Sequence, residues 1–220
     1  TRPEKNINHA VLNGDIELEV LNITVLAQAA PLPFDMSVDG YNLDLTTELD
    51  NRSLVLRQAK VQAIFKVQEW IIEAFREGLK KHGFMEFQSP VIIPQTAEGG
   101  AEVFEIKYFD YKALLAQSPQ FYKQILVGVY ERVFTVNKTL RAEPSVTTRH
   151  LTESVTLDGE MGFIESWEDI MEEVEYIIKY IFQKVTDDCE KQLKLFQTSV
   201  PKVSDKIPRI KMREAQEIIF

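Results

Sequence analysis

The chain has 220 residues, of which 45% are hydrophobic and 27% charged, which is enough for one substantial domain with a hydrophobic core. Its formal net charge of -9 argues against broad nonspecific binding to nucleic acid. No apolar run approaches the roughly 20 residues that span a bilayer, and no signal peptide follows the first residues. A single cysteine, Cys189, excludes an internal disulfide framework and predicts a reducing, cytoplasmic location without membrane contact.

The first 52 residues divide into a strand-like part and a looser part. Apolar and acidic residues alternate in the first half of the segment from Asp15 to Leu26, a pattern that predicts a half-buried strand. One or two strands do not fold alone, so residues 1–30 are either the end of a preceding domain or an edge added to the main one. Residues 31–52 carry two prolines and Gly40 without periodicity, which predicts a hinge or linker.

A long helix is predicted from about Leu54 to Lys81, with Gly83 as its C-terminal cap. The extended segment Phe84–Pro94 follows, and its two prolines confine it to a sheet edge or a bulge. An apolar edge can pair with another subunit, so this segment also predicts a dimer. The apolar stripe of the helix consists of Val61, Ile64, Phe65, Ile72, Phe75 and Leu79.

Two short segments carry polar residues suited to an amino-acid ligand. Glu98 precedes two glycines, and a carboxylate in such a flexible loop can close over a cationic group. A helix is predicted to begin after Ser118-Pro119, with Gln120 and Lys123 on one face. One neutral and one cationic donor suit a carboxylate-bearing ligand. Taken alone, the Glu98 segment fits a plain surface turn better, and the Gln120–Lys123 segment fits a solvated helix end equally well.

Residues 140–161 read as two short strands around a polar loop. The loop and its edges gather Arg141, Arg149 and His150. Guanidinium groups bind phosphate oxygens bidentately and histidine adds a further donor, so this hairpin suits a polyphosphate. A solvated turn with ordinary surface charges is the alternative for these residues taken alone.

The C-terminal third is predicted to be helical. Ser166 is placed as an N-cap for a helix that runs to about Phe196, and a further helix begins at Lys211. The chain contains no internal repeat, no Walker-type or GxGxxG loop and no metal-spaced Cys/His cluster.

Taken together, these pieces resemble the catalytic domain of class II aminoacyl-tRNA synthetases, most closely aspartyl-tRNA synthetases of the archaeal and eukaryotic cytosolic type. The resemblance covers roughly residues 49–220. It rests on Leu49–Arg52, Gly83–Pro90 (similar to motif 1), Glu98–Gly100, Leu115–Gln124 and Arg141–Glu153 (similar to motif 2).

The resemblance implies an α/β (α+β) fold with a mainly antiparallel sheet flanked by helices. Residues 1–30 look like the last strands of an OB-type anticodon-binding barrel, and residues 31–52 like the hinge. Residues 53–220 would then form the catalytic domain, incomplete at its C-terminal end. A homodimer built on the motif 1 helix and strand is also implied.

The implied reaction uses ATP and Mg2+ to convert aspartate to aspartyl-adenylate, which then esterifies tRNA. Such catalysis is mainly positioning and charge stabilisation. Arg141 matches the motif 2 arginine that holds the α-phosphate and the amino-acid carboxylate, Glu143 the adenine-side acid and His150 the γ-phosphate contact. These three are the expected catalytic residues, and Arg149 and Leu151 complete the expected ATP-binding set.

The expected amino-acid pocket consists of five residues: Glu98, Gln120, Lys123, Arg141 and Asp158. Glu98 and Asp158 match contacts to the substrate ammonium. Lys123 separates aspartate from asparagine, because a buried carboxylate needs a cationic partner and the similar asparaginyl enzymes have an uncharged residue there. Those enzymes also have Ser-Ser in place of Ser118-Pro119.

Three features depart from the family pattern. Ser154 stands where relatives have a phenylalanine that stacks on adenine. The segment 136–140 reads Val-Asn-Lys-Thr-Leu in place of Ile-Gly-Pro-x-Phe, and Pro144 enters the loop. Motif 3, with its second ATP arginine and metal-binding acids, is missing, so no metal ligand is assigned.

These departures leave two interpretations of the chain. We expect a fragment of a longer enzyme, in preference to a divergent homologue that no longer aminoacylates. The alternative functions are a catalytically impaired paralogue with a binding or regulatory role, and an enzyme similar to asparaginyl-tRNA synthetase.

Overall fold

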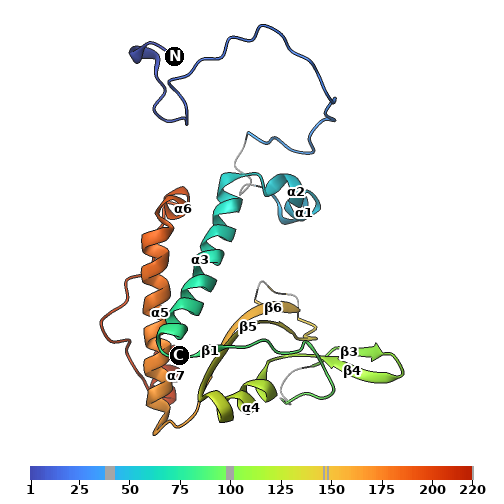
Figure 1. The fold of residues 1–220 in the computed structure, drawn as a ribbon, viewed down its shortest axis with the longest axis vertical. Coiled ribbons are helices and arrows are strands. Elements are labelled where there is room, and N and C mark those ends of the chain that lie inside the picture. The colour runs from blue at the N-terminus through green and yellow to red at the C-terminus, as the bar shows by residue number, and fades with distance from the viewer. Residues whose placement is uncertain (38–42, 98–101, 146, 148, 220) are drawn as a thin grey trace. The chain divides into compact units, whose positions relative to one another are not determined.

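A computed structural model describes the chain except residues 38–42, 98–101, 146, 148 and 220 (Figure 1). The chain divides into two units, residues 1–38 and residues 39–220, and each unit is described by itself. The second unit contains all the elements described below except a single 3-10 turn. Among the described residues, no helix is long and apolar enough to cross a membrane.

The first unit holds a 3-10 turn, η1 (Glu4–Asn6), and no strand among its described residues 1–37. The strand predicted between Asp15 and Leu26 is therefore wrong for this structure. Leu18, Leu21 and Leu26 in this segment are exposed. A strand forms only where a neighbouring strand satisfies its backbone groups, and the first unit supplies no such neighbour among its described residues. The alternation of residue types alone could not reveal this.

Three helices open the second unit: α1 (Leu45–Asp50), α2 (Arg52–Val55) and α3 (Ala59–Lys81). The single helix predicted from Leu54 to Lys81 is thus interrupted between α2 and α3. Gly83 follows α3 with a φ of 80°, the left-handed conformation expected of a C-terminal cap.

Two three-stranded sheets follow among the described residues. Figure 1 draws their strands as arrows. In the first, the order is β1-β5-β6, with β1 parallel to β5 and β5 antiparallel to β6. Its strands are β1 (Met85–Glu86), β5 (Arg132–Leu140) and β6 (Glu153–Met161). The pairing is mainly antiparallel, which confirms the predicted fold class. Strand β1, which opens the extended segment Phe84–Pro94, lies at the sheet edge, also as predicted.

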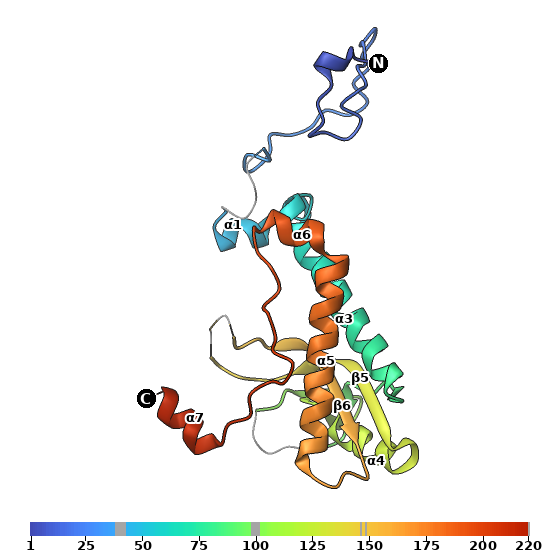
Figure 2. The same ribbon diagram turned by 90° about the vertical axis from the view of Figure 1, so that its left-hand side faces the viewer.

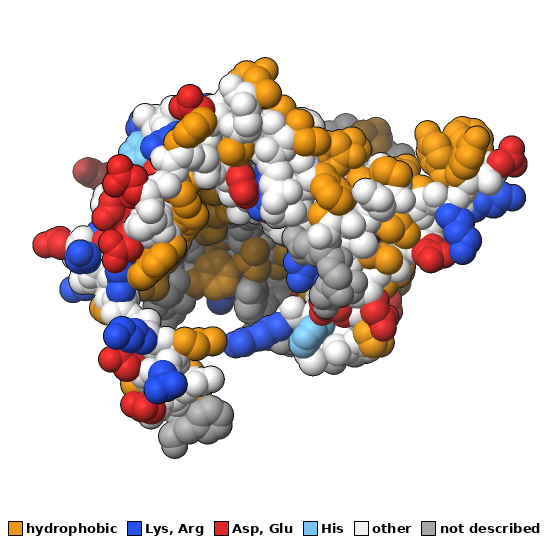
Figure 3. Space-filling model, turned by 90° about the horizontal axis from the view of Figure 1, so that it is seen from below, with side chains coloured by type: hydrophobic (Ala, Val, Ile, Leu, Met, Phe, Trp, Pro, Cys, Tyr) orange, Lys and Arg blue, Asp and Glu red, His pale blue; other side chains and the backbone are white. Residues whose placement is uncertain are grey.

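The second sheet is antiparallel throughout, with the order β2-β4-β3. Its strands are β2 (Ile92–Ile93), β3 (Glu105–Tyr108) and β4 (Tyr111–Leu115). The β3–β4 turn exposes Tyr108, Phe109 and Tyr111. Figure 3 shows hydrophobic side chains at the surface on the side where Figure 1 draws this hairpin. Helix α4 (Gln120–Tyr130) then leads into β5, and it begins directly after Pro119 as predicted.

The C-terminal helices are α5 (Trp167–Asp188), α6 (Glu190–Leu195) and α7 (Met212–Ile219). Ser166 caps α5 together with Asp169 in a reciprocal capping box, which confirms the predicted N-cap. The helix expected to continue to Phe196 is instead interrupted at the buried Cys189.

Helices α3 and α5 lie side by side against one face of the β5–β6 pair (Figures 1 and 2). They approach closely at Gly78, where an added Cβ atom would lie 2.5 Å from Ile177 Cδ1. The core between helices and strands consists of Phe75, Leu79, Phe84, Phe134 and Ile177. This layer fixes the position of the hairpin on which the candidate site is built.

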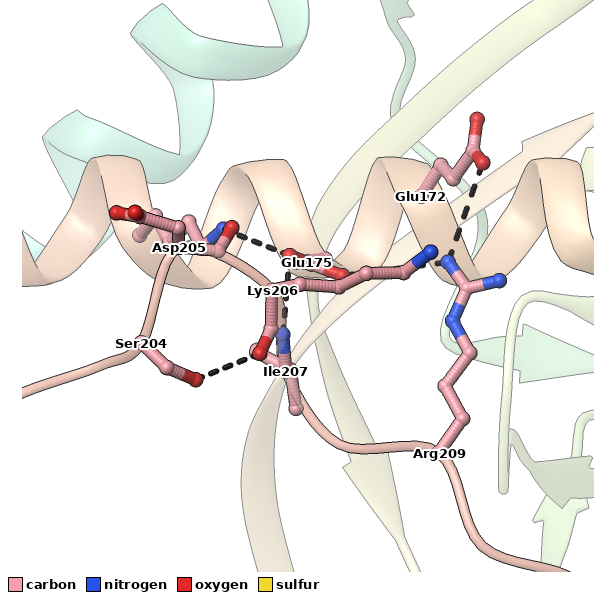
Figure 4. A network of polar contacts seen from close by, with 8 residues as sticks. Glu172, Glu175, Ser204, Asp205, Lys206, Ile207 and Arg209 are labelled. Carbon is pink, nitrogen blue, oxygen red and sulfur yellow. Dashed lines mark hydrogen bonds and ion pairs between the residues drawn. The ribbon is translucent and has the colours of Figure 1, made fainter.

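The segment before α7 is attached to α5 by polar contacts (Figure 4). Glu175 Oε1 accepts a hydrogen bond from the Ile207 backbone N–H at 3.1 Å. Arg209 Nη2 lies 3.9 Å from Glu175 and 4.0 Å from Glu172. The Glu175 pKa is lowered, first by the hydrogen bond from Lys179 and then by that from Ile207, which keeps this carboxylate charged.

Candidate active site

The two strands of the β5–β6 hairpin have one apolar and one polar face. Directly opposed residues of an antiparallel pair share a face. Phe134 opposes Gly159 and Val136 opposes Leu157 on the face that α3 and α5 cover. On the other face, the opposed pairs are Thr135 with Asp158, Asn137 with Thr156 and Thr139 with Ser154. The second face is therefore a row of hydroxyl, amide and carboxylate groups.

Helix α4 places Lys123 over the polar face. Lys123 Nζ lies 2.8 Å from Asp158 Oδ1 and 3.2 Å from Glu160 Oε2. The side chains of Lys123, Asp158 and Glu160 are 13%, 20% and 30% exposed. Asp158 and Glu160 are two residues apart on β6, so they project from the same face and converge on one cation. The structure thus brings together Lys123 and Asp158, two residues of the expected amino-acid pocket.

The two carboxylates keep Lys123 in its positively charged ammonium form. Burial disfavours the ammonium form, but the hydrogen bond to Asp158 and the charges of Asp158 and Glu160 outweigh it, so the pKa of Lys123 is raised. One lysine facing two carboxylates leaves a local charge of about -1. Such a site can accept a ligand ammonium as well as offer a cation.

Sequence reasoning did not include Glu160 in the site, although it lies next to the predicted residues. The available signal was the spacing of two acids at alternate positions of one strand, Asp158-Gly159-Glu160. That spacing places both carboxylates on one face whenever the segment is a strand. The hydroxyl of Thr135, opposite Asp158, is buried without a hydrogen-bond partner among the described residues.

Gln120 and its neighbour Gln117 lie at the entrance to α4. Gln120 is half-buried in the first turn, and its backbone N–H donates to Ser118 Oγ at 3.3 Å. Gln117 is buried and bridges two segments: its Oε1 accepts from Thr96 Oγ1 at 3.1 Å, and its Nε2 donates to the Glu102 carbonyl at 3.2 Å. Gln117 therefore holds the residues on both sides of 98–101. The predicted site residue Glu98 lies outside the described residues.

The predicted phosphate-binding residues lie at the other end of the hairpin. The backbone N–H of Arg141 donates to the Thr152 carbonyl at 2.9 Å, which extends the strand pairing by one step. The side chains of Arg141, Arg149 and Leu151 are exposed. They face solvent on the loop between β5 and β6.

Glu143 and His150 face each other across this loop. His150 Nε2 lies 4.0 Å from Glu143 Oε2, and His150 Nδ1 lies 2.6 Å from Thr147 Oγ1. The loop therefore holds a histidine between a carboxylate and a hydroxyl, with both arginines nearby in the sequence. Between Glu153 and Asp158, β6 extends five residues, about 16 Å at the usual rise of a strand. The expected site consequently has two parts, which we call the amino-acid end, at Lys123 and Asp158, and the nucleotide end, at the loop.

Ser154 lies on the polar face between these two ends. Its Oγ is 3.1 Å from the Oγ1 of Thr139, the residue opposite it on β5. A pair of hydroxyls thus occupies the position at which the family pattern has an aromatic ring. Within the described residues, no group of three His, Cys, Asp or Glu side chains is arranged to hold a metal ion.

Comparison with known proteins identifies the class. Residues 44–220 match the family described as tRNA synthetases class II (D, K and N). The chain therefore belongs to this family of class II tRNA synthetases.

Relatives named for aspartate and asparagine are among the matches. The aspartate–tRNA(Asp/Asn) ligase of Methanopyrus kandleri is 40% identical over 94% of this chain and 48% of its own length. That of Sulfurisphaera tokodaii is 42% identical, with 93% and 47% covered. The chain spans about half the length of the curated relatives it matches.

Solved structures of both branches share the fold. The asparaginyl-tRNA synthetase of Pyrococcus horikoshii, complexed with asparaginyl-adenylate, matches with a TM-score of 0.79 and 33% identity, over 92% of this chain and 47% of that chain. A putative aspartyl-tRNA synthetase from Leishmania major Friedlin matches with a TM-score of 0.68 and 37% identity, over 78% and 34%.

Proposed function

We propose that this chain is the core of an aspartate–tRNA ligase, which activates aspartate with ATP and transfers it to tRNA. The observation that carries the proposal is Lys123, a largely buried cation on the polar face of the hairpin, held by Asp158 and Glu160. A side-chain carboxylate of the substrate needs such a cation, whereas an amide does not. The aspartate–tRNA ligases among the relatives support the same assignment.

In this proposal, the amino-acid end of the site binds aspartate and the nucleotide end binds ATP. Lys123 takes the side-chain carboxylate of aspartate, and Asp158, with Gln120 and Glu98, takes the ammonium group. Arg141, at the nucleotide end, holds the substrate α-carboxylate against the α-phosphate of ATP. Attack by a carboxylate oxygen on the α-phosphorus then releases pyrophosphate.

At the nucleotide end, the residues act on the phosphates and the base. His150 contacts the γ-phosphate, with Arg149 and Leu151 completing the ATP site, and Glu143 faces the adenine. Arginine is suited to this task because its planar fork binds two phosphate oxygens at once. The contribution of these residues is orientation and stabilisation of the charge that develops in the transition state.

Magnesium enters this proposal with ATP. Mg2+ prefers oxygen ligands, retains several waters and is commonly bound through substrate phosphates. The described residues contain no cluster of three His, Cys, Asp or Glu side chains that could hold it.

The domain organisation and assembly belong to the same proposal. Residues 1–30 correspond to the end of an OB-type anticodon-binding domain, 31–52 to a hinge and 53–220 to the catalytic domain. The protein forms a homodimer through α3 and the segment Phe84–Pro94. The exposure of Ile64, Phe65 and Ile92 supports this surface, because it offers apolar area to a second subunit. The location is cytoplasmic, as expected for an enzyme that charges tRNA.

A second candidate is a paralogue with impaired catalysis that acts as a binding or regulatory protein. The Thr139–Ser154 hydroxyl pair favours it, because these groups offer adenine no aromatic face. Lys123 disfavours an enzyme for asparagine, because the amide side chain of asparagine brings no negative charge to pair with the ammonium group of Lys123.

Pyrophosphate exchange into ATP separates these functions. The assay is run on the longest natural form of the protein with aspartate, with asparagine and without amino acid. We expect exchange with aspartate alone. Exchange with asparagine at an equal rate would contradict the proposed specificity for aspartate. No exchange with either amino acid would favour the impaired paralogue.

A further inference from the structure

Two carboxylates share one lysine at the amino-acid end of the site. Asp158 Oδ1 is the closer partner of Lys123 Nζ, at 2.8 Å, and Glu160 Oε2 is the second, at 3.2 Å. Both acids project from one face of β6, while the lysine reaches them from α4. A single carboxylate would neutralise the cation, so the second acid is in excess of what the ion pair needs.

The substrate explains the excess acid. Aspartate brings an ammonium group that must be paired with a carboxylate, and a side-chain carboxylate that must be paired with a cation. If Asp158 were the sole partner of Lys123, its move to the ammonium group would leave Lys123 without a partner from the protein. With Glu160 in place, Lys123 keeps one protein carboxylate while it accepts the substrate carboxylate.

We propose that Glu160 is a positioning residue, which holds Lys123 while Asp158 turns to the ammonium group of the substrate. This inference rests on the proposed function and adds a residue to it. Glu160 does not contact the phosphates or the substrate α-carboxylate in this arrangement. Glu160 therefore stabilises bound amino acid equally in the ground state and in the transition state, so it affects KM and not kcat.

The variant Glu160→Gln tests this role, because glutamine keeps the shape and one acceptor oxygen but loses the charge. Without that charge, Lys123 retains Asp158 as its partner and competes with the ammonium group for it. We expect the KM for aspartate in pyrophosphate exchange to rise about tenfold, with kcat and the KM for ATP within about twofold of wild type. An unchanged KM for aspartate would overturn the inference.

Succinate has both carboxylates of aspartate but no ammonium group. It therefore tests whether Glu160 acts by freeing Asp158 from Lys123 for the substrate ammonium group, or in some other way. Succinate makes no demand on Asp158, so its inhibition constant is expected to be the same in wild type and Glu160→Gln. An equal weakening of both ligands would mean that Glu160 only orients Lys123. Tighter binding of both would mean that Glu160 simply repels the substrate carboxylate. Either result contradicts the proposal.

Glu105→Gln provides the matched control. Glu105 pairs with Lys112 at 3.1 Å on the exposed β3–β4 hairpin, outside the site. We expect its kinetic constants to be those of wild type, and the melting temperature of each variant shows whether it is folded. Wild-type protein without aspartate-dependent exchange would reject the proposed function itself. Active wild type with an unaffected Glu160→Gln variant would reject only the role of Glu160.

Discussion

The two faces of the β5–β6 hairpin differ in the polarity of the side chains that they carry. On one face, Phe134 and Val136 pack against α3 and α5 in the core. On the other face, Thr135, Asn137 and Thr139 line a polar surface with Asp158 and Glu160 opposite or beside them. Side chains of a strand alternate between its faces, so one residue of β5 packs in the core and the next lies on the polar face.

This comparison explains how a small hairpin can hold a charged site in a fixed position. The apolar face anchors the two strands to a helical layer, which leaves the polar face to carry the charged and hydrogen-bonding groups. Lys123 is added from α4, which lies over the polar face. Substitutions on the apolar face should therefore change the free energy of unfolding, and those on the polar face should change substrate binding.

The largest expected effect is on the apolar face. Phe134 is fully buried, and its ring packs edge-to-face with Phe75 at a centroid distance of 5.6 Å. Phe134→Ala removes this packing and leaves a cavity, so we expect a loss of about 3–5 kcal/mol in the free energy of unfolding, measured by urea denaturation. Phe109→Ala, at the exposed β3–β4 turn, is the control and should change it by less than about 0.5 kcal/mol. A small effect of Phe134→Ala would mean that this face is not the anchor.

The polar face is tested most strongly by Lys123→Met, which keeps the length of the side chain but removes the charge. Truncating one member of a largely buried ion pair costs about 2–5 kcal/mol of binding free energy, so aspartate binding by calorimetry should weaken at least about 30-fold. Lys112→Met, which removes an exposed lysine paired with Glu105, is the matched control and should bind aspartate as wild type does.

The same variant makes a prediction about pH. Burial lowers the pKa of Lys123, but its hydrogen bond to Asp158 and the charges of Asp158 and Glu160 outweigh burial, so the pKa is raised in the folded state. A lysine whose pKa is raised on folding stabilises the protein fully below its unfolded pKa of about 10.4, and this stabilisation is lost as the pH rises through the folded pKa. The loss of stability in Lys123→Met should therefore be larger at pH 8 than at pH 11. An equal loss at both pH values would show that the two acids do not stabilise the charge of Lys123.

Much of this hairpin was predictable from the sequence, because its signals are local. The strands and the helix start near Pro119 followed from residue patterns, and the structure confirms them. Family resemblance placed Lys123 and Asp158 in one expected pocket, but it did not predict the contact between them. Ser166 as a helix N-cap also follows from local chemistry, since its hydroxyl and the Asp169 carboxylate satisfy free backbone N–H groups.

The parts that were not predictable depend on residues distant in the sequence. The alternation between Asp15 and Leu26 indicated a strand, but a strand requires a partner that the pattern cannot supply. The break at Cys189 interrupts a continuous helical pattern, and the buried thiol at that point has a raised pKa because of its burial. Glu160 was missed because only the approach of α4 shows that Lys123 has two partners.

A smaller effect is expected between the two ends of the polar face, at Ser154. Ser154→Phe restores the aromatic ring of the family pattern, and stacking of a base on such a ring is worth about 1–3 kcal/mol. The KM for ATP in aspartate-dependent exchange should therefore fall roughly 5- to 150-fold, with the KM for aspartate unchanged. Ser154→Ala, which removes the hydroxyl without adding a ring, should leave the KM for ATP unchanged. A fall in both variants would show that the Thr139–Ser154 contact, rather than the missing ring, sets the affinity.

The smallest effect is expected where the apolar face reaches solvent. Lys138 shares that face with Phe134 and Val136, but it lies near the loop and pairs with Glu153 at 2.6 Å, with the two side chains 64% and 51% exposed. Water screens such a pair, so Lys138→Ala should cost only about 0.2–1 kcal/mol of unfolding free energy, and raising the salt concentration should reduce the difference further. A loss as large as that of Phe134→Ala would mean that anchoring extends along the whole strand. The expected gradient instead places the anchor at the base of the hairpin, beside the amino-acid end of the site.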